Sequence, residues 1–159
     1  MNDERFNVLK KHLCSREIFD LDENDPQVDF SNWEVRDYDQ TIVTPLGEYV
    51  VLTDVESLQM ATKDIMQTLW ACRADFLARH LPLGEDVIRH IQKTMSEDAN
   101  ETFATLLDIK CKHCRTERYN SAALVAEALE ADGHAHYIAH YDHKQHVSDC
   151  GNFYIYRTH

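Results

Sequence analysis

The sequence predicts an α+β domain: a small antiparallel sheet, formed by an N-terminal hairpin and a C-terminal hairpin, packed on two long helices and one short helix. Two observations support this class. The spacing of apolar residues changes from two to about 3.6 near residue 53, and strand-forming residues return after residue 133. Strands at both ends of a helical middle are typical of α+β proteins. With 159 residues the chain is long enough to bury a core, so we expect a single domain over residues 1–159.

The N-terminal part is predicted to begin with a helix and to continue as an acidic connection. Phe6, Leu9 and Leu13 recur at helical spacing, which indicates a helix over residues 4–14. Residues 17–32 include the stretch "DLDENDPQVDFSN", whose five acids and single proline disfavour regular structure. We therefore expect residues 17–32 to form a polar connection.

A β-hairpin or meander is predicted from "WEVRDYDQTIVTPLGEYVVLT", which begins at Trp33. This stretch is rich in β-branched and aromatic residues, which favour strands. Pro45-Leu46-Gly47 supplies the turn between two of the strands.

The first long helix is predicted over about residues 55–80. Thr53 is the expected N-cap, and Glu56 lies three residues later, which is the spacing of a capping box. The apolar residues that recur along one face are Leu58, Ala61, Ile65, Leu69, Cys72 and Phe76. Because Pro82 and Gly84 follow, the helix should end before them.

Two further helices are predicted before the chain returns to strands. The second covers about residues 85–109, or restarts near Ser96. The third covers about residues 121–131, with Asn120 as its N-cap and Gly133 as its C-terminal stop.

The C-terminal part is predicted to form the second hairpin. Its strands are expected in "HAHYIAHY", residues 134–141, and in "NFYIYRT", residues 152–158, with a turn near Asp142-His143-Lys144. In such a strand His134, His136 and His140 would all face the same way, because side chains alternate between the two faces.

Charge is the strongest compositional signal. The net charge is −12, and the segment from Glu17 to Asp64 contains thirteen acids and two bases, which leaves −11 there. Such a field repels nucleic acids and anionic membranes and attracts basic protein surfaces, although it can also serve solubility alone. The candidate partner-binding residues are Asp20, Asp22, Glu23, Asp25, Asp29, Glu34, Asp37 and Asp39.

Two stretches carry a resemblance to a known group of proteins. "EADGHAHYIAHYDHKQHVSDCGNFYIYRTH" resembles the C-terminus of small proteins encoded by bacteriophages and other mobile elements, and "GEYVVLTDVES" resembles their entry into the first long helix. Those proteins carry arginine-glycine where this chain has His134-Ala135, and a turn glycine where it has His143. Their function is unassigned, so the resemblance implies a phage-type origin; by analogy, acidic phage proteins of this size are often inhibitors of host defence systems.

A zinc site is a second candidate. Cys111-Lys112-His113-Cys114 is a Cys-x-x-Cys, a spacing that lets two thiolates occupy two corners of a tetrahedral zinc site. Two further ligands would be needed, from His113 or from the tail residues His134, His136, His140, His143, His146 and Cys150. Of these, His134 and His136 are the first candidates. The alternative is a pair of ordinary cysteines in a loop that follows a helix.

Two classes of function follow from these observations. The first is a non-enzymatic acidic interaction protein that binds a basic, nucleic-acid-binding site of a host protein. The second is a small zinc-stabilised or metal-dependent hydrolase or nuclease, with carboxylates such as Asp132, Asp142 and Asp149 beside the histidines. No HExxH motif, nucleophile elbow or glycine-rich phosphate loop accompanies them.

The expected location is the cytoplasm. No apolar run approaches the roughly 18 residues needed to span a bilayer, and the N-terminus lacks the apolar core of a secretion signal. The five cysteines are odd in number and scattered, which does not indicate a disulfide framework.

Overall fold

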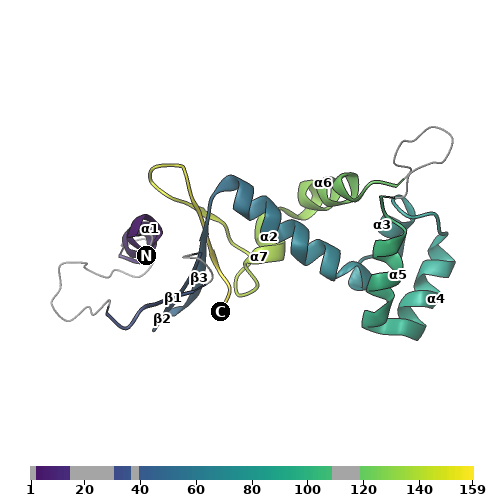
Figure 1. Ribbon diagram of the computed structural model, residues 1–159, viewed down its shortest axis with the longest axis horizontal. Helices are drawn as coiled ribbons and strands as arrows, with labels where there is room; N and C mark the ends of the chain where they lie inside the picture. The colour runs from purple at the N-terminus through teal and green to yellow at the C-terminus, as the bar shows by residue number, and fades with distance from the viewer. Residues whose placement is uncertain (1–2, 15–30, 37–39, 109–118) are drawn as a thin grey trace. The chain divides into compact units, whose positions relative to one another are not determined.

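The computed structural model describes residues 3–14, 31–36, 40–108 and 119–159, and these form an α+β fold (Figure 1), as the sequence predicts. The elements are α1 (Asp3–Leu13), β1 (Glu34–Arg36), β2 (Thr41–Thr44), β3 (Gly47–Leu52), α2 (Asp54–Gln67), η1 (Leu69–Ala71), α3 (Ala74–Ala78), α4 (Glu85–Met95), η2 (Ser96–Asp98), α5 (Ala99–Thr105), α6 (Ser121–Asp132), α7 (His134–Ile138), β4 (His146–Val147) and β5 (Tyr154–Arg157). The chain divides into two compact units: the sheet unit, Met1–Met60 with His134–His159, and the helical unit, Ala61–Gly133. A single domain over residues 1–159 stays a prediction.

The sheet unit contains one five-stranded antiparallel sheet with the order β1-β2-β3-β5-β4. The predicted N-terminal hairpin is confirmed. A C-terminal hairpin also forms, but its first strand is β4 and not the predicted residues 134–141; the two hairpins join where β3 pairs with β5. Leu52 lies opposite Tyr154 at one end of this pairing, and Tyr49 lies opposite Arg157 at the other. At the β2–β3 turn the Thr44 hydroxyl donates to the Gly47 carbonyl at 2.9 Å.

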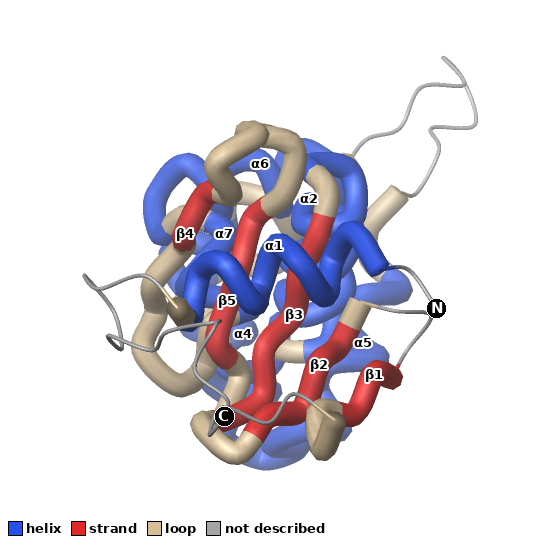
Figure 2. Tube along the Cα trace, turned by 90° about the vertical axis from the view of Figure 1, so that its left-hand side faces the viewer, coloured by secondary structure: helices blue, strands red, loops and turns tan. Residues whose placement is uncertain are grey.

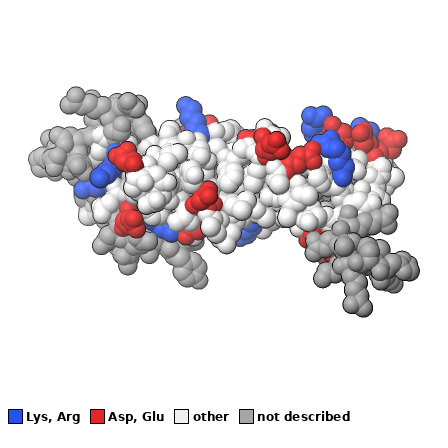
Figure 3. All heavy atoms as spheres, turned by 90° about the horizontal axis from the view of Figure 1, so that it is seen from above, with Lys and Arg blue, Asp and Glu red and all other residues white. Residues whose placement is uncertain are grey.

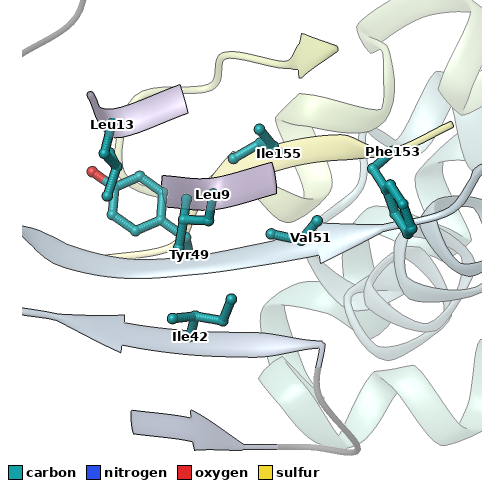
Figure 4. Close-up of a cluster of buried hydrophobic side chains, with 7 residues drawn as sticks. All are labelled: Leu9, Leu13, Ile42, Tyr49, Val51, Phe153 and Ile155. Atoms are coloured by element: carbon teal, nitrogen blue, oxygen red, sulfur yellow. The ribbon is translucent and has the colours of Figure 1, made fainter. Parts of the chain in front are cut away.

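The two faces of the sheet are covered by different helices. Figure 2 shows α1 crossing the near face, with α7 behind the strands. The side chains buried between α1 and the sheet (Figure 4) are Leu9, Leu13, Ile42, Tyr49, Val51, Phe153 and Ile155. Alternate residues of the central strands, such as Val50 and Tyr156, are buried on the opposite face, as strand geometry requires.

A buried arginine ties α1 to the rest of the sheet unit. The guanidinium of Arg5 donates to both carboxylate oxygens of Glu56, at 2.6 and 2.7 Å, and to the Val51 carbonyl at 2.6 Å. It also lies 5.3 Å from the centroid of the Phe153 ring. Glu56 completes the predicted capping box, because it accepts from the backbone N–H of Thr53 at 2.8 Å. Arg5 lowers the pKa of Glu56 to about 2.

The predicted single helix over residues 55–80 is wrong, because the chain forms α2, η1 and α3 there. Asn100 causes the first break. A continuous helix would join the Trp70 N–H to the Met66 carbonyl. Instead the Trp70 N–H donates to Asn100 Oδ1 at 3.3 Å, and Asn100 Nδ2 donates to the Met66 carbonyl at 2.8 Å. A side-chain amide is thus inserted into the helical ladder, which is a known cause of helix breaks.

The remaining helices of the helical unit agree with the sequence. The predicted restart near Ser96 is confirmed, since α4 ends there and Ser96 has a φ of 49°. Asn120 caps α6 by accepting from the Ala122 N–H at 2.7 Å, and Gly133 follows α6 with a φ of 79°. The buried apolar residues of this unit are Ala61, Ile65, Leu69, Ala74, Leu77, Leu81, Ile88, Ala99, Phe103, Leu107, Leu124, Val125 and Ala128.

The strand predicted for residues 134–141 is also wrong, because His134–Ile138 form the short helix α7. In a helix, residues four apart share a face, so His134 and Ile138 lie on one side. Ile138 is buried and His134 is hydrogen-bonded to Ser57, so this side of α7 packs into the sheet unit. The second predicted strand is confirmed as β5. Among the described residues, every helix is too short or too polar to cross a bilayer.

Candidate interaction surface

One of the eight predicted partner-binding residues is described by the structure. Glu34 begins β1, an edge strand of the sheet, and its side chain is 60% exposed. It accepts hydrogen bonds from Arg36, with Nη2 at 2.8 Å, and this contact lowers the pKa of Glu34. The residues outside the described ranges are Asp20, Asp22, Glu23, Asp25, Asp29, Asp37 and Asp39.

The predicted acidic residues lie on both sides of the edge strand β1 in the sequence. Five of the candidate acids precede it within residues 17–32, and Asp37 and Asp39 follow Arg36 directly. The candidate acids outside the described residues are therefore close in sequence to an edge strand of the sheet. On the face drawn in Figure 3, the acidic and basic side chains of the described residues are interspersed.

The acids between Glu17 and Asp64 do not all have the same role. Glu56 belongs to the Arg5 contact, and Glu48 accepts from the Thr158 hydroxyl at 2.9 Å. Asp54 is exposed in the first turn of α2, where a negative charge is favoured by the helix dipole. Some of the acidic charge therefore stabilises the fold, while some faces solvent.

Four large hydrophobic side chains are exposed among the described residues of the sheet unit: Tyr141, which is 58% exposed, and three aliphatic ones. Val55 and Leu58 of α2 are 66% and 47% exposed, and Val147 of β4 is 56% exposed. The prediction that Leu58 belongs to the buried stripe of α2 is wrong. Periodicity identified the apolar face, but Ser57 and Ala61 are the residues of this stretch with no exposed surface.

A buried chain of hydrogen bonds links Ser57 to the histidine tail. Ser57 Oγ lies 2.9 Å from His134 Nδ1 and 2.7 Å from the Tyr156 hydroxyl, which donates to Gln145 Oε1 at 2.8 Å. The single proton of Tyr156 goes to Gln145, so Ser57 donates to Tyr156 and accepts from His134 Nδ1–H. Burial raises the pKa of Tyr156.

This chain has a structural role and does not form a catalytic dyad. A serine nucleophile needs a histidine nitrogen that accepts its proton, whereas His134 donates to Ser57 in this arrangement. Ser57 also has no exposed surface. The contacts join α2, α7 and β5, so they hold the second face of the sheet in place.

The predicted zinc ligands are only partly described. Cys111 and Cys114 lie outside the described residues. His134 and His136 are two positions apart on a helix, so their side chains point about 200° apart instead of sharing a strand face. The His136 ring stacks on that of His143 at 5.5 Å. Within the described ranges, no three His, Cys, Asp or Glu residues are grouped so that they could bind a metal ion.

His12 provides a pH-dependent contact between α1 and β4. Its ring centroid lies 4.6 Å from that of His146. Burial lowers the pKa of His12 from 6.5 to about 4; His146 adds to this effect and Asp142 opposes it. Between pH 6.5 and 4 the unfolded chain therefore binds this proton more readily than the folded protein.

We expect the free energy of unfolding to decrease as the pH is lowered through this window. From pH 7 to pH 5 the parent should lose roughly 1 kcal/mol more than a His12→Gln variant, after allowance for solvent screening. Urea denaturation at both pH values measures the difference. His90→Gln, which changes an exposed histidine of the helical unit, is the control and should retain the parent's pH dependence. Equal losses in the parent and in His12→Gln would contradict this assignment.

Comparison with known proteins places the chain in no group. No family model, no curated protein and no solved structure matches it.

Proposed function

We propose that this chain is a non-enzymatic acidic interaction protein that binds a basic, nucleic-acid-binding site of a host protein. An inhibitor of a host defence system is the concrete example of such a protein. The observation that carries the proposal is the concentration of charge: −11 of the net −12 lies between Glu17 and Asp64. The resemblance of the C-terminal segment to phage-encoded proteins supports the choice of a host protein as the partner.

The uneven charge has a physical consequence. Solubility requires only dispersed charge, whereas crowded carboxylates repel one another and oppose the compact state. A basic partner would neutralise this repulsion on binding. Complementary charge acts mainly by accelerating association, so binding should weaken strongly as salt is added.

Some acids of the segment stabilise the fold and are not among those proposed to bind. Glu48 and Glu56 have partners within the sheet unit. Of the proposed binding residues, Glu34 lies in the edge strand β1, and the other seven precede or follow this strand in sequence. A variant that neutralises four of them leaves Arg5 and Glu56 themselves unchanged.

The test is a charge-neutralised variant with a matched control. Asp22→Asn, Glu23→Gln, Asp25→Asn and Asp29→Asn are combined in the first protein. The control removes four exposed acids of the helical unit, by Glu97→Gln, Asp98→Asn, Glu101→Gln and Glu130→Gln. Both proteins lose the same net charge, so a difference between them reports where the charge lies.

We expect the first variant to bind a fluorescent nonaarginine peptide about tenfold more weakly than the control at about 0.01 M salt. The difference should shrink at about 0.15 M salt, where screening acts over about 8 Å. Fluorescence anisotropy measures both affinities. If the neutralised protein matches the parent in affinity and in salt dependence, the proposal is wrong. If the neutralised variant is weaker as expected, the target is sought among proteins that the parent, but not the neutralised variant, retains from a bacterial lysate.

A further inference from the structure

The hydrogen bonds of β2 determine how the edge strand beside it is oriented. The Val51 N–H donates to the Gln40 carbonyl at 2.9 Å, so residues 40 and 51 form a hydrogen-bonded pair. Such pairs alternate along antiparallel strands, so Ile42 directs its backbone groups toward β3. Its neighbours Thr41 and Val43 therefore direct theirs toward β1.

Val35 is the residue of β1 whose backbone points away from the sheet. Glu34 and Arg36 lie opposite Val43 and Thr41, so their backbone groups bond to β2. Val35 lies between them, and its N–H and C=O face outward at the edge of the sheet (Figure 2). Within the described ranges neither group has a hydrogen-bond partner. An extended chain beside β1 would satisfy both groups, which is how a strand is added to a sheet edge.

The side chains at this edge determine the sequence pattern that an added strand needs. Val35 and Trp33 pack against the buried cluster between α1 and the sheet. Glu34 and Arg36 alternate with Val35, so they lie on the opposite face, where they are exposed and paired with each other. An added strand therefore needs an apolar side chain beside Val35 and polar side chains at the two flanking positions.

The charge of the surrounding sequence favours basic side chains at those polar positions. Residues 17–40, which include β1, contain nine acids and one base, a net charge of −8. The 24 residues 136–159, which include the other edge strand β4, contain two acids and two bases and have no net charge. A second copy of this chain would bring the same excess of acids to β1 and be repelled, whereas lysine or arginine would be attracted.

We infer that the outer edge of β1 accepts an extended segment of the partner as an additional antiparallel strand, in which arginine or lysine alternates with apolar residues. The inference rests on the proposed function and states how the basic partner is bound. Charge alone attracts any basic surface. Backbone hydrogen bonds to Val35 require an extended segment, and the alternation of apolar and basic side chains sets its register.

Two isomeric fluorescent peptides test the backbone contact. Both alternate arginine with valine; in one the valines are N-methylated, and in the other an equal number of arginines is N-methylated. In an antiparallel strand with valine beside Val35, the valine N–H groups face β1 and the arginine N–H groups face solvent. At about 0.01 M salt we expect the valine-methylated isomer to bind the parent about tenfold more weakly than the arginine-methylated isomer. Fluorescence anisotropy measures both affinities.

Three protein variants test the same contact from the other side. Val35→Pro removes the outward N–H and leaves the groups that bond to β2 unchanged, since proline is tolerated where its nitrogen faces solvent at an edge. Val35→Ala shortens the side chain but retains the N–H. Val147→Pro makes the same change at the other edge: the Ser148 N–H donates to the Phe153 carbonyl at 2.9 Å, so by alternation Val147 points away from β5.

We expect only Val35→Pro to bind the arginine-methylated isomer about tenfold more weakly than the parent, because one backbone donor is lost. Val35→Ala and Val147→Pro should bind it as the parent does. Thermal melts check that each variant is folded. If Val35→Pro is not, the comparison of the two isomers on the parent decides alone.

The outcomes separate this inference from the proposed function. If the parent binds both isomers equally and Val35→Pro matches Val35→Ala, strand addition is wrong, while weaker binding of both isomers by the charge-neutralised variant still supports the proposed function. If the charge-neutralised variant binds as the parent does and Val35→Pro is weakened, strand addition stands and the acidic-segment proposal is wrong. Equal weakening by Val35→Pro and Val147→Pro would show that the contact is not specific to β1, which contradicts the inference.

Discussion

Glu56→Ala is expected to lower the free energy of unfolding by about 3 kcal/mol, because it leaves the charge of Arg5 buried without its carboxylate partner. The side chains of Arg5 and Glu56 are only 10% and 23% exposed, and two hydrogen bonds of 2.6 and 2.7 Å join them. The Val51 carbonyl would remain as a neutral acceptor for Arg5. The capping box of α2 would be lost as well. Urea denaturation monitored by circular dichroism measures the change.

Glu34→Ala is the matched control, because it removes a carboxylate from an exposed pair. The side chains of Arg36 and Glu34 are 52% and 60% exposed, and such solvent-exposed pairs contribute little to the free energy of unfolding. Equal effects of Glu34→Ala and Glu56→Ala would show that burial does not determine the contribution of the Arg5 contact.

Gly47→Ala is expected to lower the free energy of unfolding by about 3 kcal/mol, as backbone strain combines with a steric clash. Gly47 has a φ of 147°, which residues with a Cβ rarely adopt. An added Cβ would collide with the backbone oxygen of His159 and lie 2.8 Å from Nε of Arg157. It would therefore disturb the hydrogen bond, 3.1 Å long, from the Glu48 N–H to the His159 carbonyl.

The control for this substitution is Gly84→Ala. Gly84 has a φ of −75°, and an added Cβ would meet nothing within 4 Å. We expect a loss of at most about 1 kcal/mol there, from the weaker N-cap of α4. If thermal denaturation shows Gly47→Ala and Gly84→Ala to be equally stable, the β2–β3 turn does not require glycine.

Features that depend on near neighbours could be predicted from the sequence. The capping box of Thr53 and Glu56, the cap at Asn120 and the stop at Gly133 each involve residues a few positions apart. Their hydrogen bonds form whenever the local backbone turns into a helix, so residue types at fixed spacing are sufficient evidence.

The incorrect predictions depended on residues far away in the chain. The break after α2 requires Asn100, thirty positions beyond Trp70. The helix α7 includes His134, whose partner Ser57 is 77 positions earlier. Propensity is a weak guide where such contacts decide the local structure, and alternating histidines and apolar residues fit a strand as well as a short helix.

The candidate surface was predictable only in part. Charge counting located the acidic segment, because net charge needs no coordinates. It could not show that Glu56 belongs to a buried pair while Asp54 faces solvent. Periodicity likewise placed Leu58 in an apolar stripe, although the inward positions of Glu56 and Ser57 leave Leu58 exposed.

The pairing of β3 with β5 has a consequence for biosynthesis. Tyr154, the partner of Leu52, is translated 102 residues later. At about 5–20 residues per second, the ribosome needs roughly 5–20 s to make that interval. During this delay β3 lacks its neighbour, so its edge can pair with other nascent chains. The segment Ala61–Gly133 emerges meanwhile and contains its own buried core. The helical unit can therefore fold first, and translation speed between Leu52 and Tyr154 determines how long the edge of β3 stays without its partner strand.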